Sequence, residues 1–244
     1  FVAVLAELRE HFATQPIHVS DRRWVKIVWL LRIAAAAEGR PDVAPWDLLL
    51  LPWLTAPDAS RQAAVADWLT ARLGVREAFS PLRLTRVVAA FETQLEAELK
   101  ANDLDYDEAG RLKFSASELA DEIGDAKGGA AAPRISYSRK RRYGELHIAA
   151  RVRQVDSLLE RIAGYAAEIA TQRAGLGAYA AQSLWLVQDL TARAAANLEA
   201  TAAAIDELAM RARAARAGFL ALPRLETDNG KIPEPVAHET LDAA

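Results

Sequence analysis

The chain has 244 residues, enough for one large or two small domains with a sizeable core. Its formal net charge is −3, so a general attraction to nucleic acid or anionic lipid is not expected, and the absence of cysteine excludes disulfides and thiolate metal sites. No apolar run is long enough for a membrane span, and no signal peptide is recognisable, so we expect a cytoplasmic protein.

The first 74 residues predict four short helices. Apolar residues at three-to-four spacing predict a first helix over 1–12, and Ser20 or Asp21 can cap a second helix over 21–37 that stops at Gly39. Proline at position 45 begins a short third element, and a fourth helix over 59–73 ends at glycine 74. The tryptophans of this stretch are expected to form its core, at positions 24, 29, 46, 53 and 68.

The middle of the chain changes character. A helix is predicted over 81–102, starting at a serine followed by a first-turn proline. Residues 103–147 then lose helical periodicity and contain glycine, proline and two short alternating stretches. We interpret 103–147 as an inserted module with a small β element.

Two long helices give the strongest periodic signal. A four–three apolar spacing persists through 148–169 and again through 184–212, which predicts a helical hairpin with its reversal at Gly175 and Gly177. The helix over 81–102 is long enough to join 148–219 as a third member of the bundle. The polar, aperiodic residues 220–244 are expected to be a disordered tail. The predicted fold class is therefore all-α: a small helical bundle followed by a long hairpin or three-helix bundle with an insertion.

Arg22 and Arg23 fall in the first turn of the second predicted helix. A cation there opposes the helix dipole, so its presence suggests that an anion approaches this end of the helix. The alternative is that both arginines simply lie on a solvated surface.

Other chemistry finds little support. The four histidines are scattered without metal-ligand spacing, no Gly-x-Ser-x-Gly elbow occurs, and no Gly-x-x-x-x-Gly-Lys-[Ser/Thr] phosphate loop is present. We therefore expect no metal site and no catalytic residue in this chain, which alone should not hydrolyse ATP. One basic cluster remains, and it is either a solvated turn or a contact for an anionic partner: Arg139, Lys140, Arg141 and Arg142.

Several of these features occur together in one family. The run Val19-Ser20-Asp21-Arg22-Arg23-Trp24 follows Leu8-Arg9-Glu10 and precedes Gly39-Arg40 and an element from Val43 through Asp47 to Leu51 that ends near Trp53. In this order residues 1–74 resemble the lid of a AAA+ ATPase of the MoxR branch, most closely the RavA-type members. More loosely, the order 81–102, 103–147 and 148–219 resembles the triple-helical domain with an inserted module that follows the lid in RavA.

The resemblance implies a function. Arg22 takes the sensor-2 position that contacts nucleotide, with Arg23 as the neighbouring alternative, and ATP with Mg²⁺ is held by an upstream AAA+ core. The resemblance also implies a homo-hexamer, a von Willebrand factor A-domain partner and chaperone-like remodelling. Because Phe1 already lies in a periodic stretch, we expect the chain to be a C-terminal piece of such a protein. The open alternative is a non-enzymatic helical adaptor whose coiled hairpin binds a partner.

Overall fold

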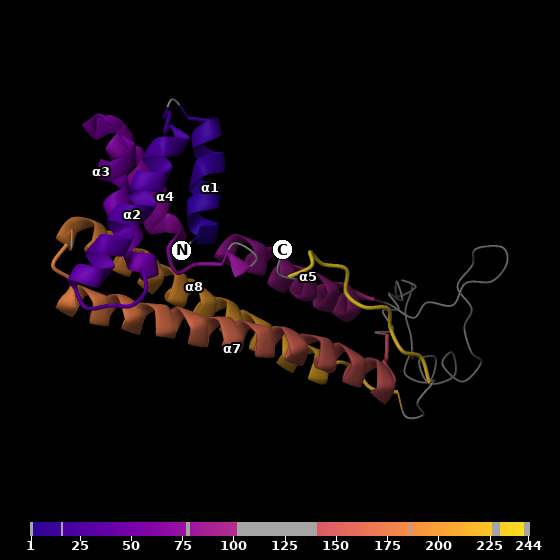
Figure 1. Cartoon of the computed structure of the whole chain (residues 1–244). Coiled ribbons are helices and arrows are strands. Elements are labelled where there is room, and N and C mark those ends of the chain that lie inside the picture. The colour runs from indigo at the N-terminus through magenta and orange to yellow at the C-terminus, as the bar shows by residue number, and fades with distance from the viewer. Residues whose placement is uncertain are drawn as a thin grey trace, which may run out of the picture. The chain divides into compact units, whose positions relative to one another are not determined.

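The computed structural model describes residues 2–15, 17–76, 79–101, 141–185, 187–225 and 230–241. The regular elements in these ranges are all helices, which confirms the predicted all-α fold (Figure 1). The only β pairing among the described residues is one isolated parallel bridge between Tyr143 and Arg224. Most of the predicted insertion, including its small β element, lies outside the described residues. In the described part of the chain, none of the helices combines the length and apolar character that a bilayer crossing requires.

The contacts divide the chain into two compact units. Unit 1 contains Phe1–Arg86, Glu160–Met210 and Glu239–Ala244, and unit 2 contains Val87–Leu159 and Arg211–His238. Three helices contribute residues to both units: α5 (Pro81–Lys100), α7 (Glu145–Gln182) and α8 (Gln188–Leu220). The predicted domain boundaries remain predictions, since the contacts group the first helices with parts of α7 and α8.

The first helices of unit 1 begin and end where local signals predict. They are α1 (Val2–Ala13), α2 (Asp21–Ala37), the 3₁₀ helix η1 (Pro45–Leu50) with its continuation α3 (Leu51–Thr55), and α4 (Ala59–Arg72). The Ser20 hydroxyl caps α2 by accepting from the Arg23 N–H at 3.4 Å. The chain leaves α2 and α4 through glycines in the left-handed region, with φ of 72° at Gly39 and 80° at Gly74.

The core of unit 1 draws on helices that are distant in sequence. Fully buried leucines from the first helices lie at positions 8, 31, 48, 51, 69 and 73. Ile162 and Ile169 of α7 and Leu198 of α8 are also fully buried in the same unit. Burying one such side chain contributes about 2 kcal/mol to folding. The parts of α7 and α8 in unit 1 therefore complete the core of the first four helices.

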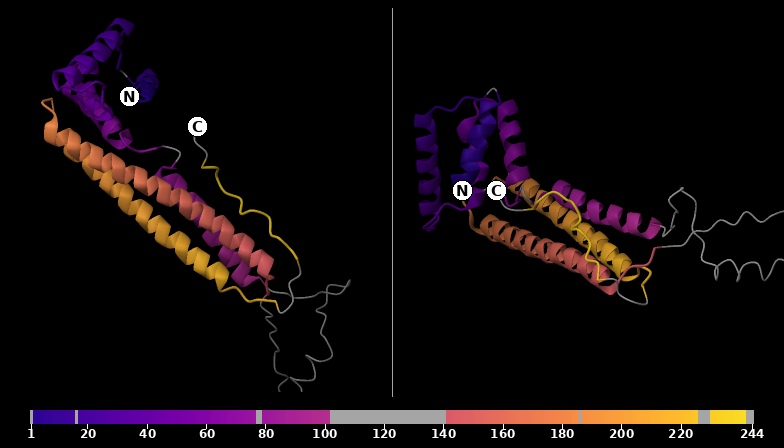
Figure 2. Two further views of the ribbon diagram at one scale, coloured as in Figure 1. Left: turned by 60° about the horizontal axis from the view of Figure 1, so that its bottom comes forward. Right: turned by 90° about the vertical axis from the view of Figure 1, so that its right-hand side faces the viewer.

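The two long helices form the predicted hairpin. In unit 1, Arg173 of α7 pairs with Glu199 of α8 at 3.3 Å, and in unit 2 Asp156 of α7 pairs with Arg216 of α8 at 2.6 Å. Residue numbers fall along α7 as they rise along α8, so the helices are antiparallel, and both views of Figure 2 show them side by side. In unit 2, α5 is the third helix, because Glu92 accepts two hydrogen bonds from Arg211 at 2.9 and 2.6 Å.

The predicted reversal at Gly175 and Gly177 is wrong. The first long helix continues through both glycines to Gln182, and the chain reverses between Ser183 and Val187. Neither glycine has a positive φ. A Cβ on Gly175 would make only an ordinary contact at 3.7 Å with Trp46, so nothing at this position requires a turn.

Two further expectations differ from the structure. Trp46 is buried, but Trp29 and Trp53 are 61% and 45% exposed, because the apolar residues of the first helices cover more than one face. The predicted disordered tail overlaps the last turn of α8, and its described part packs against helices. Val236 and Leu241 are 8% and 1% exposed, which shows that single apolar residues in a polar stretch can bury without any periodic pattern.

Replacement of Gly74 by alanine tests how closely α4 approaches the hairpin. A Cβ there would lie 3.0 Å from a Leu198 methyl and 3.1 Å from the Trp46 ring, and φ is already positive. Gly39 has the same backbone conformation but no atom within 4 Å of its Cβ position. We expect Gly39→Ala to cost about 1 kcal/mol and Gly74→Ala about 2 kcal/mol or more in urea unfolding. An equal loss of unfolding free energy in the two variants would show that the side chains around Gly74 can move aside without cost.

Candidate functional site

The two candidate arginines at the start of α2 have different environments. Both are exposed. The Arg23 Nε donates to the Leu54 carbonyl oxygen at 2.8 Å, which ties the start of α2 to the end of α3. Within the described ranges, the Arg22 side chain takes part in no hydrogen bond or ion pair. Arg22 is therefore the arginine whose guanidinium is available to an external anion.

The first turn of α2 is charged, and a largely apolar groove lies beyond it. Asp21, which precedes Arg22, forms an ion pair with Arg9 of α1, with 2.7 Å between Oδ1 and Nη2, so its carboxylate already has a cationic partner. Beyond the first turn of α2, a groove opens between α1 and α2, lined mainly by Val2, Leu5, Trp24, Val25, Val28 and Trp29. Arg22 lies at the N-terminus of α2 and is not among the residues that line this groove.

The basic cluster is described only in part. Arg139 and Lys140 lie outside the described residues, and Arg141 and Arg142 are exposed in unit 2. The Arg141 N–H donates to the Ala101 carbonyl at 2.9 Å, and its guanidinium lies 5.8 Å from the centre of the Tyr143 ring. In the described part of the chain, no three His, Asp or Glu side chains gather as metal ligands would.

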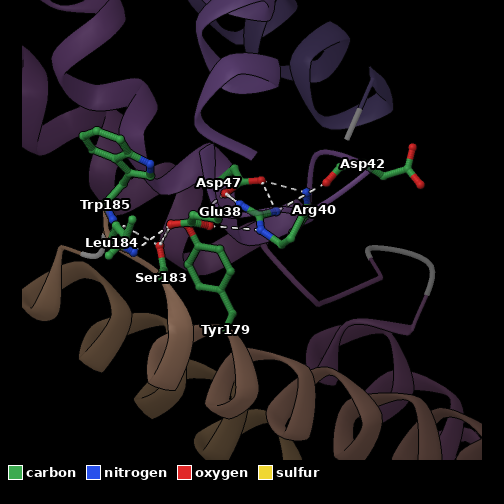
Figure 3. A network of polar contacts seen from close by, with 9 residues as sticks. Glu38, Arg40, Asp42, Asp47, Tyr179, Ser183, Leu184 and Trp185 are labelled. Atoms are coloured by element: carbon green, nitrogen blue, oxygen red, sulfur yellow. Dashed lines mark hydrogen bonds and ion pairs between the residues drawn. The ribbon is translucent and has the colours of Figure 1, made fainter. Parts of the chain in front are cut away.

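A buried ionic cluster centres on Arg40, just after the Gly39 turn (Figure 3). Its Nη1 and Nη2 donate to the two carboxylate oxygens of Asp47 at 2.8 and 2.7 Å. Its Nε and Nη2 also donate to one Glu38 oxygen at 3.0 and 2.6 Å. Asp47 is fully buried and accepts a further hydrogen bond from the Ala44 N–H at 2.7 Å, which fixes the start of η1. One guanidinium therefore holds the loop between α2 and η1.

The same carboxylates hold the end of α7. Tyr179 donates its hydroxyl to Asp47 at 2.9 Å, and its ring lies 5.5 Å from the Arg40 guanidinium carbon. The other Glu38 oxygen accepts from the Ser183 hydroxyl at 2.8 Å and the Leu184 N–H at 2.7 Å, as Figure 3 shows. We call these five side chains the Arg40 cluster: Glu38, Arg40, Asp47, Tyr179 and Ser183. It joins the first helices to the turn of the hairpin within unit 1.

The cluster keeps its groups in defined protonation states. Burial alone would raise the pKa of Glu38, but hydrogen bonds from Ser183, Arg40 and Leu184 together outweigh it and hold that pKa below its ordinary value. Hydrogen bonds to Asp47, and then to Glu38, raise the pKa of Arg40 against the opposing effect of burial. Burial raises the pKa of Tyr179 to about 12. At neutral pH Arg40 is therefore charged, Glu38 is ionised and Tyr179 is a neutral phenol.

Other contacts extend this connection along the hairpin. Arg193 of α8 forms an ion pair with Asp67 of α4. Past the end of α4, Arg76 pairs with Glu168 of α7 at 3.0 Å, and its N–H donates to the Tyr165 hydroxyl at 3.1 Å. The end of α4 is therefore also fixed to both long helices.

The comparisons with known proteins agree with this part of the fold. Residues 1–69 match the family model described as AAA lid domain. The matched segment covers α1, α2, η1, α3 and most of α4, and it includes Arg22, Arg40 and Asp47. The first helices are therefore similar to the lid domain of AAA+ ATPases. No curated protein matches the chain.

Sequence reasoning missed the Arg40 cluster as a structural unit. Gly39-Arg40 and Asp47 were visible as part of the family resemblance, but nothing in their spacing indicated partners at 179 and 183. A local signal was present, because an aspartate directly before four consecutive apolar residues at 48–51 is a candidate for a buried, paired carboxylate.

The pH dependence of stability tests Glu38. Its folded pKa lies below the ordinary 4.5, so its stabilisation is present above about pH 4.5 and is lost as pH falls through the folded value. We expect Glu38→Gln to cost about 2 kcal/mol near pH 7, and this difference from the wild type to shrink on acidification below pH 4.5. Urea unfolding of both proteins at several pH values from 7 to 3 measures this difference in unfolding free energy.

The exposed Glu10 of α1 provides the control for this experiment. Replacement by glutamine there should leave the unfolding free energy nearly unchanged at every pH. A Glu38→Gln difference that stays constant with pH would contradict the ionic role of Glu38.

Proposed function

We propose that this chain is the lid and helical region of a AAA+ ATPase of the MoxR branch, resembling the RavA type, and that Arg22 is its sensor-2 arginine. ATP and Mg²⁺ would be held by a AAA+ core upstream, and Arg22 would complete the site by contacting the γ-phosphate. Positioned cations of this kind stabilise the charge that spreads over the phosphoryl oxygens during transfer.

The observation that carries this proposal is the free guanidinium of Arg22. Its neighbour Arg23 donates a hydrogen bond to the Leu54 carbonyl, and Asp21 forms an ion pair with Arg9. The Arg22 side chain has no such contact in the described part of the chain. An unpaired cation in the first turn of a helix is repelled by the positive end of the helix dipole. A phosphate that approached this end would be attracted by both the cation and the dipole, and it would offset the repulsion between them.

The Arg40 cluster supports a mechanical role. Hydrolysis and phosphate release would remove the contact to Arg22 and change the preferred angle of the lid. Because Arg40 and its carboxylates bind both the lid loop and the end of α7, a movement of the lid would be transmitted directly to the helical hairpin. The chain would thus convert the state of the nucleotide into a displacement of α7 and α8.

The remaining features of the proposal rest on the family resemblance. They are a homo-hexameric assembly, a von Willebrand factor A-domain partner and chaperone-like remodelling of other proteins; the cytoplasmic location is an expectation from the sequence alone. The exposed Trp29 and Trp53 are consistent with an assembly, because large exposed apolar side chains commonly mark protein contacts.

One observation favours the alternative function of a helical adaptor. Leu184 and Trp185, at the turn between α7 and α8, are 73% and 47% exposed, so the tip of the hairpin presents apolar side chains. An adaptor would use this tip to bind a partner, and its arginine pair would have no role in ATP turnover.

Replacing Arg22 by alanine in the parent ATPase tests the proposal. We expect the rate of ATP hydrolysis to fall about a hundredfold, as for loss of one oriented donor to developing negative charge, with the melting temperature unchanged. Lys26, an exposed cation one turn further along α2, is the matched control, and Lys26→Ala should hydrolyse ATP at the wild-type rate. Equal activity of both variants would exclude a sensor role for Arg22 and favour the adaptor.

A further inference from the structure

The C-terminal residues of unit 2 lie as an extended segment against two helices. We call residues 230–238 the C-terminal segment; it contains no helix or strand. It includes Pro233 and Pro235, and its one buried apolar side chain is Val236, at 8% exposure. By contrast, Ile232 is 67% exposed.

Side chains of α7 bind the backbone of this segment. Arg151 Nη1 donates to the Glu234 carbonyl oxygen at 2.7 Å, and Gln154 Oε1 accepts from the Val236 N–H at 3.2 Å. The intervening Pro235 has no N–H, so it brings no donor that needs a partner. Arg151 and Gln154, which are three residues apart on α7, thus bind the carbonyl of Glu234 and the N–H of Val236. Both contacts are made to backbone atoms of the segment, so they do not depend on the identity of its side chains.

The Arg151 side chain is fixed before it meets the segment. It is 6% exposed and its Nε donates to the equally buried Glu98 of α5 at 2.8 Å. Glu98 is held in turn by Gln94 at 2.8 Å and by His147 at 3.1 Å. Because burying such an ion pair costs desolvation energy, it contributes more to orientation than to stability. The network orients the remaining Arg151 donor toward a peptide carbonyl.

A groove of mixed apolar and polar character lies beside these groups, and the segment forms part of its wall. It is lined by Phe91 of α5 and by Ala150, Arg153, Gln154 and Ser157 of α7, together with the segment itself. The His238 ring lies 5.6 Å from the Phe91 ring. The space between the segment, α5 and α7 has a volume of about 450 Å³. Preorganised backbone contacts beside a buried apolar anchor, here Val236, are features of sites that bind extended peptides.

We propose that the α5–α7 groove of unit 2 is a recognition site for an extended peptide in which proline precedes a branched apolar residue, and that the C-terminal segment occupies it in cis. A partner protein that presents such a segment would compete with residues 230–238 for Arg151, Gln154 and the groove. The covalent link gives the resident segment an effective concentration in the millimolar range, so a partner binds only when the segment is weakened or displaced.

The test uses the full chain and a fluorescein-labelled peptide with the sequence of residues 230–241. Val236→Asp should release the resident segment while leaving the groove intact, because the Asp side chain cannot be buried there without a partner. Fluorescence anisotropy should then show the peptide binding to the Val236→Asp chain at least about tenfold more tightly than to the wild-type chain. A peptide carrying the same Val236→Asp change should bind about tenfold more weakly than the unchanged peptide.

Ile232→Asp is the matched control, because Ile232 belongs to the same segment but is exposed. The Ile232→Asp chain should bind the peptide as weakly as the wild type. Equal binding by the Val236→Asp and Ile232→Asp chains, or equal binding of the two peptides, would overturn the proposal.

Circular dichroism shows whether the variant chains keep their helices. If Val236→Asp loses helical content, the milder Val236→Ala replaces it and should give the same order of affinities. Loss of helical content in both variants would show that residues 230–238 are a structural part of unit 2 and not a replaceable ligand, which would also overturn the proposal.

Discussion

The ionic contact between Arg40 and two buried carboxylates is the constraint on which the arrangement of unit 1 depends. Glu38 binds Arg40 through one carboxylate oxygen and the end of α7 through the other, whereas Asp47 Oδ1 accepts from both Arg40 and Tyr179 of α7. Removing one partner of a fully buried ion pair typically costs about 3 to 5 kcal/mol, and the cost is smaller here because the Arg40 side chain is 25% exposed. The lid helices also lack a complete core without Ile162, Ile169 and Leu198. The first helices and the hairpin ends therefore form one body within unit 1, as the proposed transmission of a nucleotide-dependent movement would require.

Most of the helix boundaries could be predicted because their causes are local. Ser20 caps α2, Gly39 and Gly74 take left-handed conformations after α2 and α4, and Pro45 opens η1. The end of α7 has a different cause, since the Leu184 N–H there is bound by Glu38, which lies 146 residues earlier. A glycine pair inside a periodic run was therefore a misleading signal.

The candidate site could be predicted only as a pair of arginines. Which of the two is free depends on the Leu54 carbonyl, 31 residues beyond Arg23, and sequence spacing does not show that contact. The C-terminal segment escaped prediction for a related reason. Its contacts bind backbone atoms through Arg151 and Gln154, and a single buried valine leaves no periodic pattern.

Hydrogen exchange measured residue by residue is the most direct test of a single lid–hairpin body. In the wild type, the most protected amides of α4 and of residues 160–182 in α7 should open with the same free energy, because they unfold together. Asp47→Asn should lower that shared free energy and the protection of the Leu184 amide, whereas Asp42→Asn, an exposed neighbour, should not. The contradicting result would be that the wild-type α4 amides exchange through an opening of lower free energy while the amides of residues 160–182 stay protected. The lid and the hairpin would then not unfold as a single body.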